Sequence, residues 1–187
     1  MNPNDIVAKV IAALDRAKIP FMVVGSFSSN VYGVERTTQD ADFVMQLEPL
    51  SINHLIRELG PDFKLDPQLG FETVTMTSRY IATHIDPLFK IEFFLLSDDA
   101  HDLTRFGKRR IEQLHATPLP LPTPEDVIIT KLRWSKGGKR TKDIEDVKNV
   151  LAVQNPANLD LPYIRHWTTL HATRDLFENL LAQTPII

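Results

Sequence analysis

The chain has 187 residues, of which 43% are hydrophobic and 24% are charged, the balance of an ordinary folded protein. It contains no cysteine, which excludes disulfide bonds and thiolate metal sites, and no apolar run approaches the roughly 18 residues of a membrane span. The net charge of −3 conceals an asymmetry: residues 1–104 hold 8 Lys/Arg and 15 Asp/Glu, whereas residues 105–187 hold 13 and 9. This division suits a metal-binding part beside a part that meets phosphates, although ordinary surface variation explains it equally well.

The first hundred residues predict alternating helices and strands, followed by a β-rich stretch. Apolar spacing and turn residues predict a helix over 4–18, a strand over 21–24, a short helix over 26–32, a strand over 40–46 and a helix over 51–59. The chain then looks β-rich from 63 to 96, with strands expected over the alternating residues 71–77 and over 89–96. A β-hairpin or meander fits this stretch.

The character of the sequence changes near residue 117. Four prolines lie between 117 and 124, so this segment is expected to be extended. Thr123, Pro124, Glu125 and Asp126 together form a strong helix start, with a cap, a first-turn proline and two acids facing the dipole. Further helix starts are expected at 141, 159–160 and 173. We therefore expect an α/β core over residues 1–116 and a helical region over residues 117–187 that packs on it.

Two short motifs carry most of the chemical information. Residues 21–24 end in Gly25 and Ser26, where a close backbone approach, helix N–H groups and a hydroxyl suit a phosphate. Asp40 and Asp42 follow on a predicted strand, whose period of two directs both carboxylates to one face. Because adjacent carboxylates repel each other unless a cation lies between them, this pattern suits Mg²⁺. The alternative for the aspartates is a solvated strand end.

A third carboxylate is expected from a neighbouring strand. Glu92 is the only acid within the apolar run 91–96, and a lone charge there needs a partner or a metal. An edge-strand glutamate that reaches solvent is the alternative. Asp86 is the rival position, but it precedes a proline and resembles a turn residue.

The helical part adds an inward lysine and two inward acids. On the helix from Pro124, Lys131 falls on the apolar side, where it either snorkels to solvent or meets an anion such as a triphosphate. On the next helix, Asp143 lies near the centre of the apolar stripe and Asp146 lies at its edge. Asp143 is either a first-turn acid favoured by the helix dipole or a group that acts as a base or orients the lysine.

Basic residues and histidines give weaker signals. Two basic clusters suit the phosphates of a nucleotide or an RNA, although solvated loops explain them at least as well: Arg105, Lys108, Arg109, Arg110 and then Arg133, Lys136, Lys139, Arg140, Lys142. Aromatic residues do not interleave with either cluster, so base stacking is not indicated. The six histidines show no metal-ligand spacing, and no role is assigned to them.

Taken in order, these residues resemble the DNA polymerase β-like nucleotidyltransferase superfamily. The flanking segments 32–38, 124–133 and 142–147 look like the abortive-infection (AbiEii-type) bacterial nucleotidyltransferases, many of which are toxins of toxin–antitoxin pairs. The resemblance spans about residues 20–175. It implies an α+β fold, in which a mixed β-sheet with helices on one face is followed by a C-terminal helical bundle.

The resemblance also implies a reaction and a role for each motif residue. The enzyme would move a nucleoside monophosphate from an NTP to a hydroxyl acceptor, RNA such as tRNA or a protein, and release pyrophosphate. Asp40, Asp42 and Glu92 would be catalytic and would hold Mg²⁺ or Mn²⁺. The remaining motif residues would bind the nucleotide: Gly25, Ser26, Lys131, Asp143 and Asp146. The superfamily often has Asp where this chain has Glu92.

Partners and location are expected on the same basis. An NTP, an RNA or protein acceptor and an antitoxin protein are the partners that the resemblance implies, and no membrane is expected. The first five residues lack the basic start and apolar stretch of a signal peptide, so the cytoplasm is expected. Two other interpretations remain open: a nucleotide-binding module without catalysis, and an interaction protein whose helical part docks a partner.

Overall fold

A computed structural model describes residues 2–114 and 117–184. The helices are α1 (Pro3–Arg16), α2 (Gly25–Tyr32), α3 (Ile52–Leu59), α4 (Ala100–Lys108), α5 (Pro124–Trp134), α6 (Thr141–Gln154), the 3₁₀ turn η1 (Pro156–Asn158), α7 (Leu161–Leu170) and α8 (Arg174–Gln183). The strands are β1 (Phe21–Val24), β2 (Asp40–Met45), β3 (Phe63–Leu65), β4 (Gly70–Glu72), β5 (Thr77–Ile85), β6 (Leu88–Leu95), β7 (Arg110–Leu114) and β8 (Thr117–Leu121).

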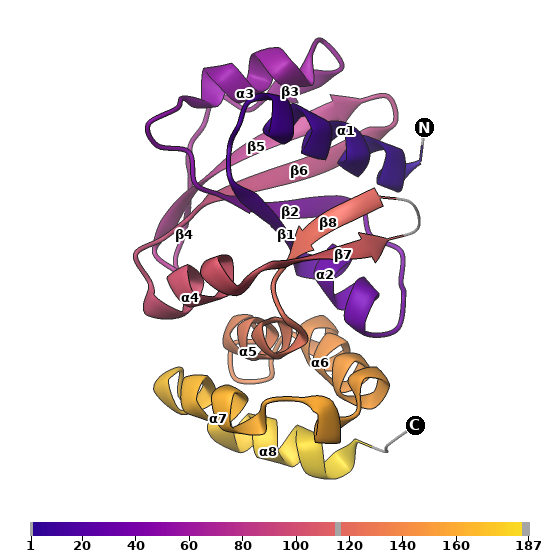
Figure 1. The fold of residues 1–187 in the computed structure, drawn as a ribbon, viewed down its shortest axis with the longest axis vertical. Coiled ribbons are helices and arrows are strands. Elements are labelled where there is room, and N and C mark those ends of the chain that lie inside the picture. Colours follow the sequence, from indigo (N-terminus) through magenta and orange to yellow (C-terminus); the bar gives the residue numbers. More distant parts are fainter. Residues whose placement is uncertain (1, 115–116, 185–187) are drawn as a thin grey trace.

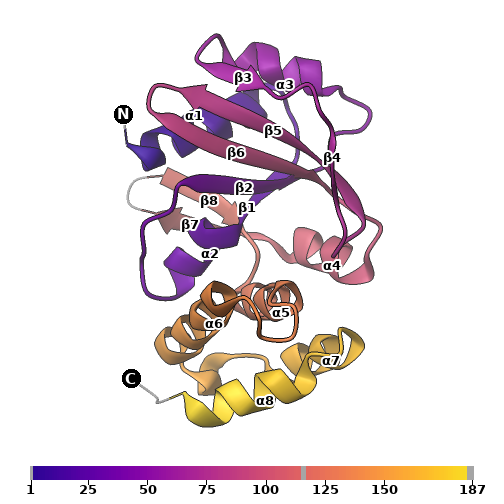
Figure 2. The same cartoon turned by 180° about the vertical axis from the view of Figure 1, so that it is seen from behind.

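Six of these strands form a mixed sheet in the order β1-β2-β6-β5-β3, with β4 paired to β5. β2 and β6 are parallel, and the other pairs are antiparallel. β7 and β8 form a separate antiparallel hairpin. Both views show α5, α6, α7 and α8 gathered at one end of the molecule, beyond the sheet (Figures 1 and 2). The fold is therefore the α+β arrangement of a mixed sheet followed by a helical bundle that the sequence predicts.

The two faces of the sheet have different surroundings. On one face, Phe43 and Phe93 are fully buried in the main core with α1 and α3, and α1 lies against this face in Figures 1 and 2. On the other face, a smaller cluster around Val44 and Phe94 packs against Phe106 of α4. Side chains alternate between the two faces along β2 and β6. The polar residues of these strands therefore point to the same face as Val44 and Phe94, called the second face below.

Helix caps account for several element boundaries. Thr123 caps α5 by accepting a hydrogen bond from Asp126 N at 3.3 Å, and Asp160 caps α7 by accepting one from Tyr163 N at 2.9 Å. α6 begins at Thr141, and Thr173 precedes α8. The proline-rich segment is extended, as predicted, and forms β8, whose Leu119 and Leu121 are fully buried.

One predicted strand is wrong. The alternation over 71–77 predicts a continuous strand, but β4 ends at Glu72 and a turn leads into β5 at Thr77. The Glu72 carboxylate accepts hydrogen bonds from Val74 N and from the N and Oγ1 of Thr75, the latter two at 2.7 and 2.6 Å. These bonds satisfy the backbone locally, so it does not continue into a ladder.

Candidate active site

Three acids predicted as catalytic lie on the second face of the sheet. Asp40 and Asp42 point to this face from β2, and Asp42 is the register partner of Glu92 on the parallel strand β6. Asp40 is the register partner of Lys90. The parallel pairing of two strands that are about 50 residues apart in sequence thus places the three carboxylates on one face of the sheet.

The Asp42 carboxyl group is held where its ionisation is unfavourable. Burial, together with the negative charges of Asp40 and Glu92, raises the pKa of Asp42 to about 7, although Lys131 and Lys90 act in the opposite direction. Asp42 keeps some accessible surface, because it faces a cavity. A cation bound there would relieve the repulsion, and an all-carboxylate oxygen donor set suits Mg²⁺. The donor types of these residues therefore fit a divalent cation, although the three acids must move closer together for all of them to bind one ion.

Gly25 makes room for the Asp42 carboxylate. Its φ of +65° lies in the left-handed region, and a Cβ added there would lie 2.0 Å from Oδ2 of Asp42. A side chain at this position would thus meet both a strained backbone and a direct clash. Gly25, which the sequence predicts to let a phosphate approach the backbone, therefore also leaves space for the Asp42 carboxylate.

The outer two acids already have partners within the chain. Glu92 Oε1 accepts from Lys90 Nζ at 2.7 Å, and Oε2 accepts from Arg79 Nη1 at 3.1 Å. The hydrogen bond to Glu92 raises the pKa of Lys90. Asp40 Oδ1 accepts from Thr38 Oγ1 at 2.8 Å. Each Glu92 oxygen has a second lone pair, so these hydrogen bonds orient the carboxylate and leave it able to bind a cation.

Lys131 reaches this region from α5 and is buried, as predicted. Its Nζ lies 2.7 Å from Asp146 Oδ2 and 3.3 Å from Asp143 Oδ1, both on α6. Asp146 is also paired with Arg36 at 2.9 Å. Although burial opposes its ionisation, the hydrogen bonds from Arg36 and the charge of Lys131 lower the pKa of Asp146. The lysine is therefore held in place by the two acids that the sequence directs inward.

Ser26 takes part in the same network. Its Oγ accepts a hydrogen bond from Arg36 Nη2 at 2.9 Å, and Ser29 Oγ donates to Asp146 at 3.2 Å. The segment between α2 and β2 is thereby tied to α6 through Arg36. Arg36 gives no signal in the sequence, because it lies in an irregular segment where periodicity carries no information.

A cavity of about 330 Å³ lies between the sheet and the helical region, and its walls include six of the eight predicted site residues. Those six are Gly25, Asp40, Asp42, Glu92, Lys131 and Asp143, whereas Ser26 and Asp146 are not among its lining residues. Four basic side chains also line it: Arg79, Lys90, Arg105 and Arg140. The cavity therefore combines a carboxylate floor with cationic walls, a combination that suits a metal-bound polyphosphate.

Of these four basic residues, Arg105 and Arg140 belong to predicted basic clusters, whereas Lys90 and Arg79 are not predicted. Strand alternation could have identified Lys90, because it lies two residues before Glu92 and shares its face. Arg79 gives no comparable signal, because its approach to Glu92 depends on the pairing of β5 with β6. Arg105 belongs to a predicted basic cluster but is buried against Asp102, with its Nε 2.7 Å from Oδ1. Asp86, the rival acid, lies in the exposed turn between β5 and β6.

The fold is that of nucleotidyltransferase-like proteins, as the comparison with solved structures shows. The antibiotic-resistance factor ANT(2'')-Ia in solution matches with a TM-score of 0.60 at 14% identity, covering 96% of this chain and 97% of that one. A crystal structure of ANT(2'')-Ia in complex with adenylyl-2''-tobramycin matches at 0.59 and 16%, covering 91% and 97%. An antigenic nucleotidyltransferase-like protein from Paracoccidioides brasiliensis matches at 0.59 and 18%, covering 100% and 96%.

Other comparisons give no match. No protein-family model matches the chain, and no curated protein matches it. Among the described residues, no helix is long and apolar enough to cross a membrane. The likeness therefore concerns the fold, and the activity has to be argued from the site.

Proposed function

We propose that this protein is a metal-dependent nucleotidyltransferase that moves a nucleoside monophosphate from an NTP to a hydroxyl acceptor and releases pyrophosphate. The observation that carries the proposal is the pairing of Asp42 with Glu92 across β2 and β6, beside Asp40 and at the floor of a cavity with cationic walls. The nucleotidyltransferase-like fold supports it.

The three carboxylates would hold Mg²⁺ or Mn²⁺. A divalent ion supplies charge neutralisation to the attacking and leaving oxygens of an in-line phosphoryl displacement. Asp42 contributes an anionic ligand once it is ionised, and Asp40 and Glu92 hold their oxygens on the same face of the sheet. Glu92, as the third acid, would also accept the proton of the acceptor hydroxyl, the role that the resemblance implies for it.

The basic residues of the cavity would bind the triphosphate. Lys131 is held by Asp143 and Asp146, so its ammonium group is positioned without being free to swing away. Gly25 allows the backbone at the start of α2 to approach a phosphate closely. Ser26, which the resemblance assigns to the terminal phosphates, would have to exchange its hydrogen bond from Arg36.

For the acceptor, an RNA such as tRNA or a protein is our first proposal. The closer relation to AbiEii-type enzymes, a toxin role with an antitoxin partner, and a cytoplasmic location are proposed on the motif order alone. A small cationic acceptor is a second candidate, because a similar fold has been crystallised with adenylyl-2''-tobramycin. In this chain, however, Glu92 and Asp102 in the cavity are already paired with Arg79, Lys90 and Arg105, which leaves fewer carboxylates for a cationic acceptor.

A transfer assay with each of the four α-labelled NTPs tests this proposal. Native protein is incubated with Mg²⁺ or Mn²⁺ and with bacterial RNA, a bacterial protein extract or tobramycin. We expect label on one acceptor with native protein and with Asp86→Asn, a matched change of an exposed acid, but not with Asp42→Asn. Label with all three proteins contradicts the assigned site.

The same assay distinguishes the alternative function. The alternative is a module that binds a nucleotide without catalysing transfer, in which the ion pairs of Glu92 with Lys90 and Arg79 would persist when the nucleotide binds. That module would bind NTP, measured by calorimetry, yet transfer no label to any acceptor.

A further inference from the structure

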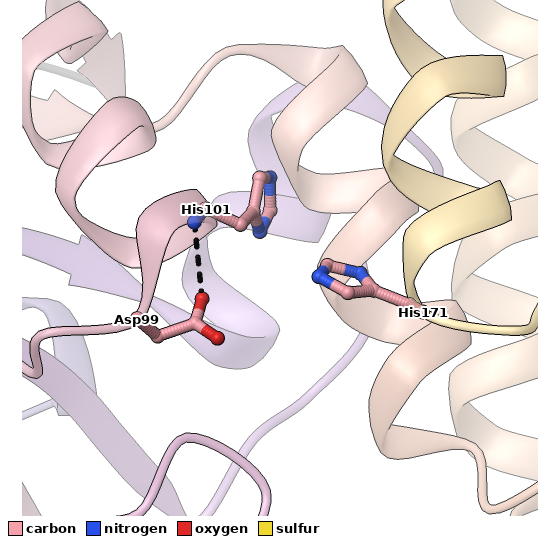
Figure 3. A group of neighbouring side chains, drawn as sticks. All are labelled: Asp99, His101 and His171. Atoms are coloured by element: carbon pink, nitrogen blue, oxygen red, sulfur yellow. Dashed lines mark hydrogen bonds between the residues drawn. The ribbon is translucent and has the colours of Figure 1, made fainter.

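A second cluster of metal-ligating side chains lies away from the carboxylates of the sheet. Asp99 and His101 come from the start of α4, and His171 follows the end of α7 (Figure 3). One potential ligand atom from each of the three lies within 4.8 Å of the others. Within residues 2–114 and 117–184 this is the one such group of three.

The Asp99 carboxylate is fixed in orientation. Oδ1 accepts hydrogen bonds from His101 N at 3.1 Å and Asp102 N at 3.0 Å, which cap α4. Oδ2 lies 2.9 Å from Nη2 of Arg133. Metal-ligating carboxylates are characteristically held by such outer hydrogen bonds, which define where their remaining lone pairs point.

His101 is held in the same manner. Its Nε2 lies 3.1 Å from Asp126 Oδ1, and Asp126 in turn accepts hydrogen bonds from Tyr163 Oη at 2.7 Å and Thr123 Oγ1 at 2.9 Å. This arrangement leaves Nδ1 of His101 as the nitrogen for a ligand. A carboxylate that accepts a hydrogen bond from the far nitrogen of a ligating histidine is a recurrent feature of zinc sites.

His171 completes the group from the other side. Figure 3 shows one ring nitrogen of His171 directed toward Asp99 and His101. The other ring nitrogen, Nδ1, is bonded to Cγ and is buried without a hydrogen-bond partner among the described residues. The ring centroid of His171 is 5.3 Å from that of His101. The nitrogen that faces Asp99 and His101, Nε2, is therefore the one that would bind an ion.

The surrounding charges can balance a divalent ion. Asp99 and Asp126 supply two negative charges, and the carbonyl end of α7 at His171 adds a partial negative charge. Two cations oppose the ion: Arg133, which pairs with Asp99, and Arg105, whose charge acts on His101. Two imidazoles and one carboxylate suit a borderline transition metal better than Mg²⁺.

We propose that Asp99, His101 and His171 bind one divalent transition-metal ion of the Zn²⁺ type, which fastens α4 to the end of α7. Tetrahedral zinc needs ligand atoms about 3.5 Å apart, so the group must contract slightly, with water as the fourth ligand. The sequence gives no hint of this site, because His101 and His171 are 70 positions apart. His115, another histidine, lies outside the described residues.

A zinc titration with histidine-ring ¹⁵N NMR tests this site on the full chain, in excess Mg²⁺ to saturate the carboxylates of the sheet. We expect one equivalent of Zn²⁺ to shift the ring signals of His101 and His171 and to leave those of His54 and His166 unchanged. His171→Gln should weaken Zn²⁺ binding at least about tenfold. His166→Gln, a matched change at an exposed position of α7, should bind as the native chain does.

Two results would overturn the assignment: unshifted His101 and His171 signals at saturating Zn²⁺, or equal affinity of His171→Gln and His166→Gln. If His171→Gln fails to fold, Asp99→Asn replaces it. Asparagine keeps an oxygen that can cap α4 but removes the ligand charge, so the same tenfold criterion applies.

Discussion

Among single residues, Asp42 shows most directly how the site lowers the free energy of unfolding. Its pKa of about 7 lies well above that of the same group in an unfolded chain, so the folded state binds an extra proton between about pH 4 and pH 7. The folded state is therefore penalised for ionising Asp42, and this penalty grows as the pH rises through that window. Below about pH 4 it is absent.

Asp42→Asn should accordingly stabilise the metal-free protein at pH 8. The full pKa shift corresponds to about 4 kcal/mol, but Asp42 faces the open cavity, so we expect a gain of about 2 kcal/mol. Urea unfolding at pH 8 and pH 5 measures it, and the gain should be smaller at pH 5. Asp86→Asn should change stability little at either pH. An Asp42→Asn protein less stable than native at both values would contradict the account of Asp42.

Gly25→Ala tests the close approach of the α2 start to Asp42. The new Cβ would meet Oδ2 at 2.0 Å, in addition to the strain of a positive φ. We expect a loss of about 3 kcal/mol in urea unfolding. Gly137→Ala is the control, because Gly137 has a φ of +70°, close to that of Gly25, but nothing within 4 Å of its Cβ, and strain alone costs about 1 kcal/mol. Equal losses for the two variants would contradict the clash.

Local patterns predict where the acids of the site point but not what they bind. Strand alternation places Asp40 and Asp42 on one face, and the isolation of Glu92 in an apolar strand marks it for a partner. The ion pair between Arg79 and Glu92 depends on the register of β5 and β6. The ion pair between Arg36 and Asp146 depends on the conformation of an irregular segment. The catalytic and nucleotide-binding roles of these residues remain predictions.

Between elements, α5 and α6 are joined by charges that are almost completely removed from water. Lys131, Asp143 and Asp146 are each less than 10% exposed. Removal of one partner leaves the others buried without a counter-charge, which is strongly destabilising.

Lys131→Ala should therefore destabilise the protein by about 2–3 kcal/mol, somewhat less than a fully unpaired buried charge costs, since Arg36 and Arg140 still face the two acids. Lys148→Ala removes an exposed ion pair with Glu145 on α6 and should cost less than about 0.5 kcal/mol. Urea unfolding of both variants checks the contrast. A Lys131→Ala protein as stable as Lys148→Ala would show that this network does not hold the helices.

Elements with strong local signals are predicted well, and those fixed by longer-range contacts are not. The Thr123 cap and its proline define the start of α5. By contrast, the alternation over 71–77 predicts a strand, but the hydrogen bonds of Glu72 form a turn there instead. No helix is predicted over 100–108, where α4 lies. α4 exists because Asp99 caps it and Phe106 packs on the sheet, and the latter contact is invisible to a local pattern.

Across the whole molecule, one core contains residues from both parts of the chain. The main cluster runs from Ile6 in α1 to Leu180 in α8 and includes Leu119 and Leu121 of β8. The boundary predicted between 116 and 117 falls between two strands that pair with each other. The division into two domains remains a prediction, and the shared core favours a single folding unit.

We therefore expect one cooperative unfolding transition. Both tryptophans, Trp134 and Trp167, lie in the helical region, so their fluorescence reports that region, whereas far-UV circular dichroism reports all elements. The two urea transitions should coincide. A fluorescence transition displaced from the dichroism transition would show that the helical region unfolds separately.

The central claim is that the carboxylates of β2 and β6 serve nucleotidyl transfer, and paired labelling of the NTP tests it most directly. With the acceptor and nucleotide found by the transfer assay, α-labelled and γ-labelled NTP are compared in native protein and Asp42→Asn. The account predicts that native protein moves the α label to the acceptor and releases the γ label as pyrophosphate, and that Asp42→Asn does neither. Transfer of the γ label to the acceptor, or undiminished α transfer by Asp42→Asn, would contradict it.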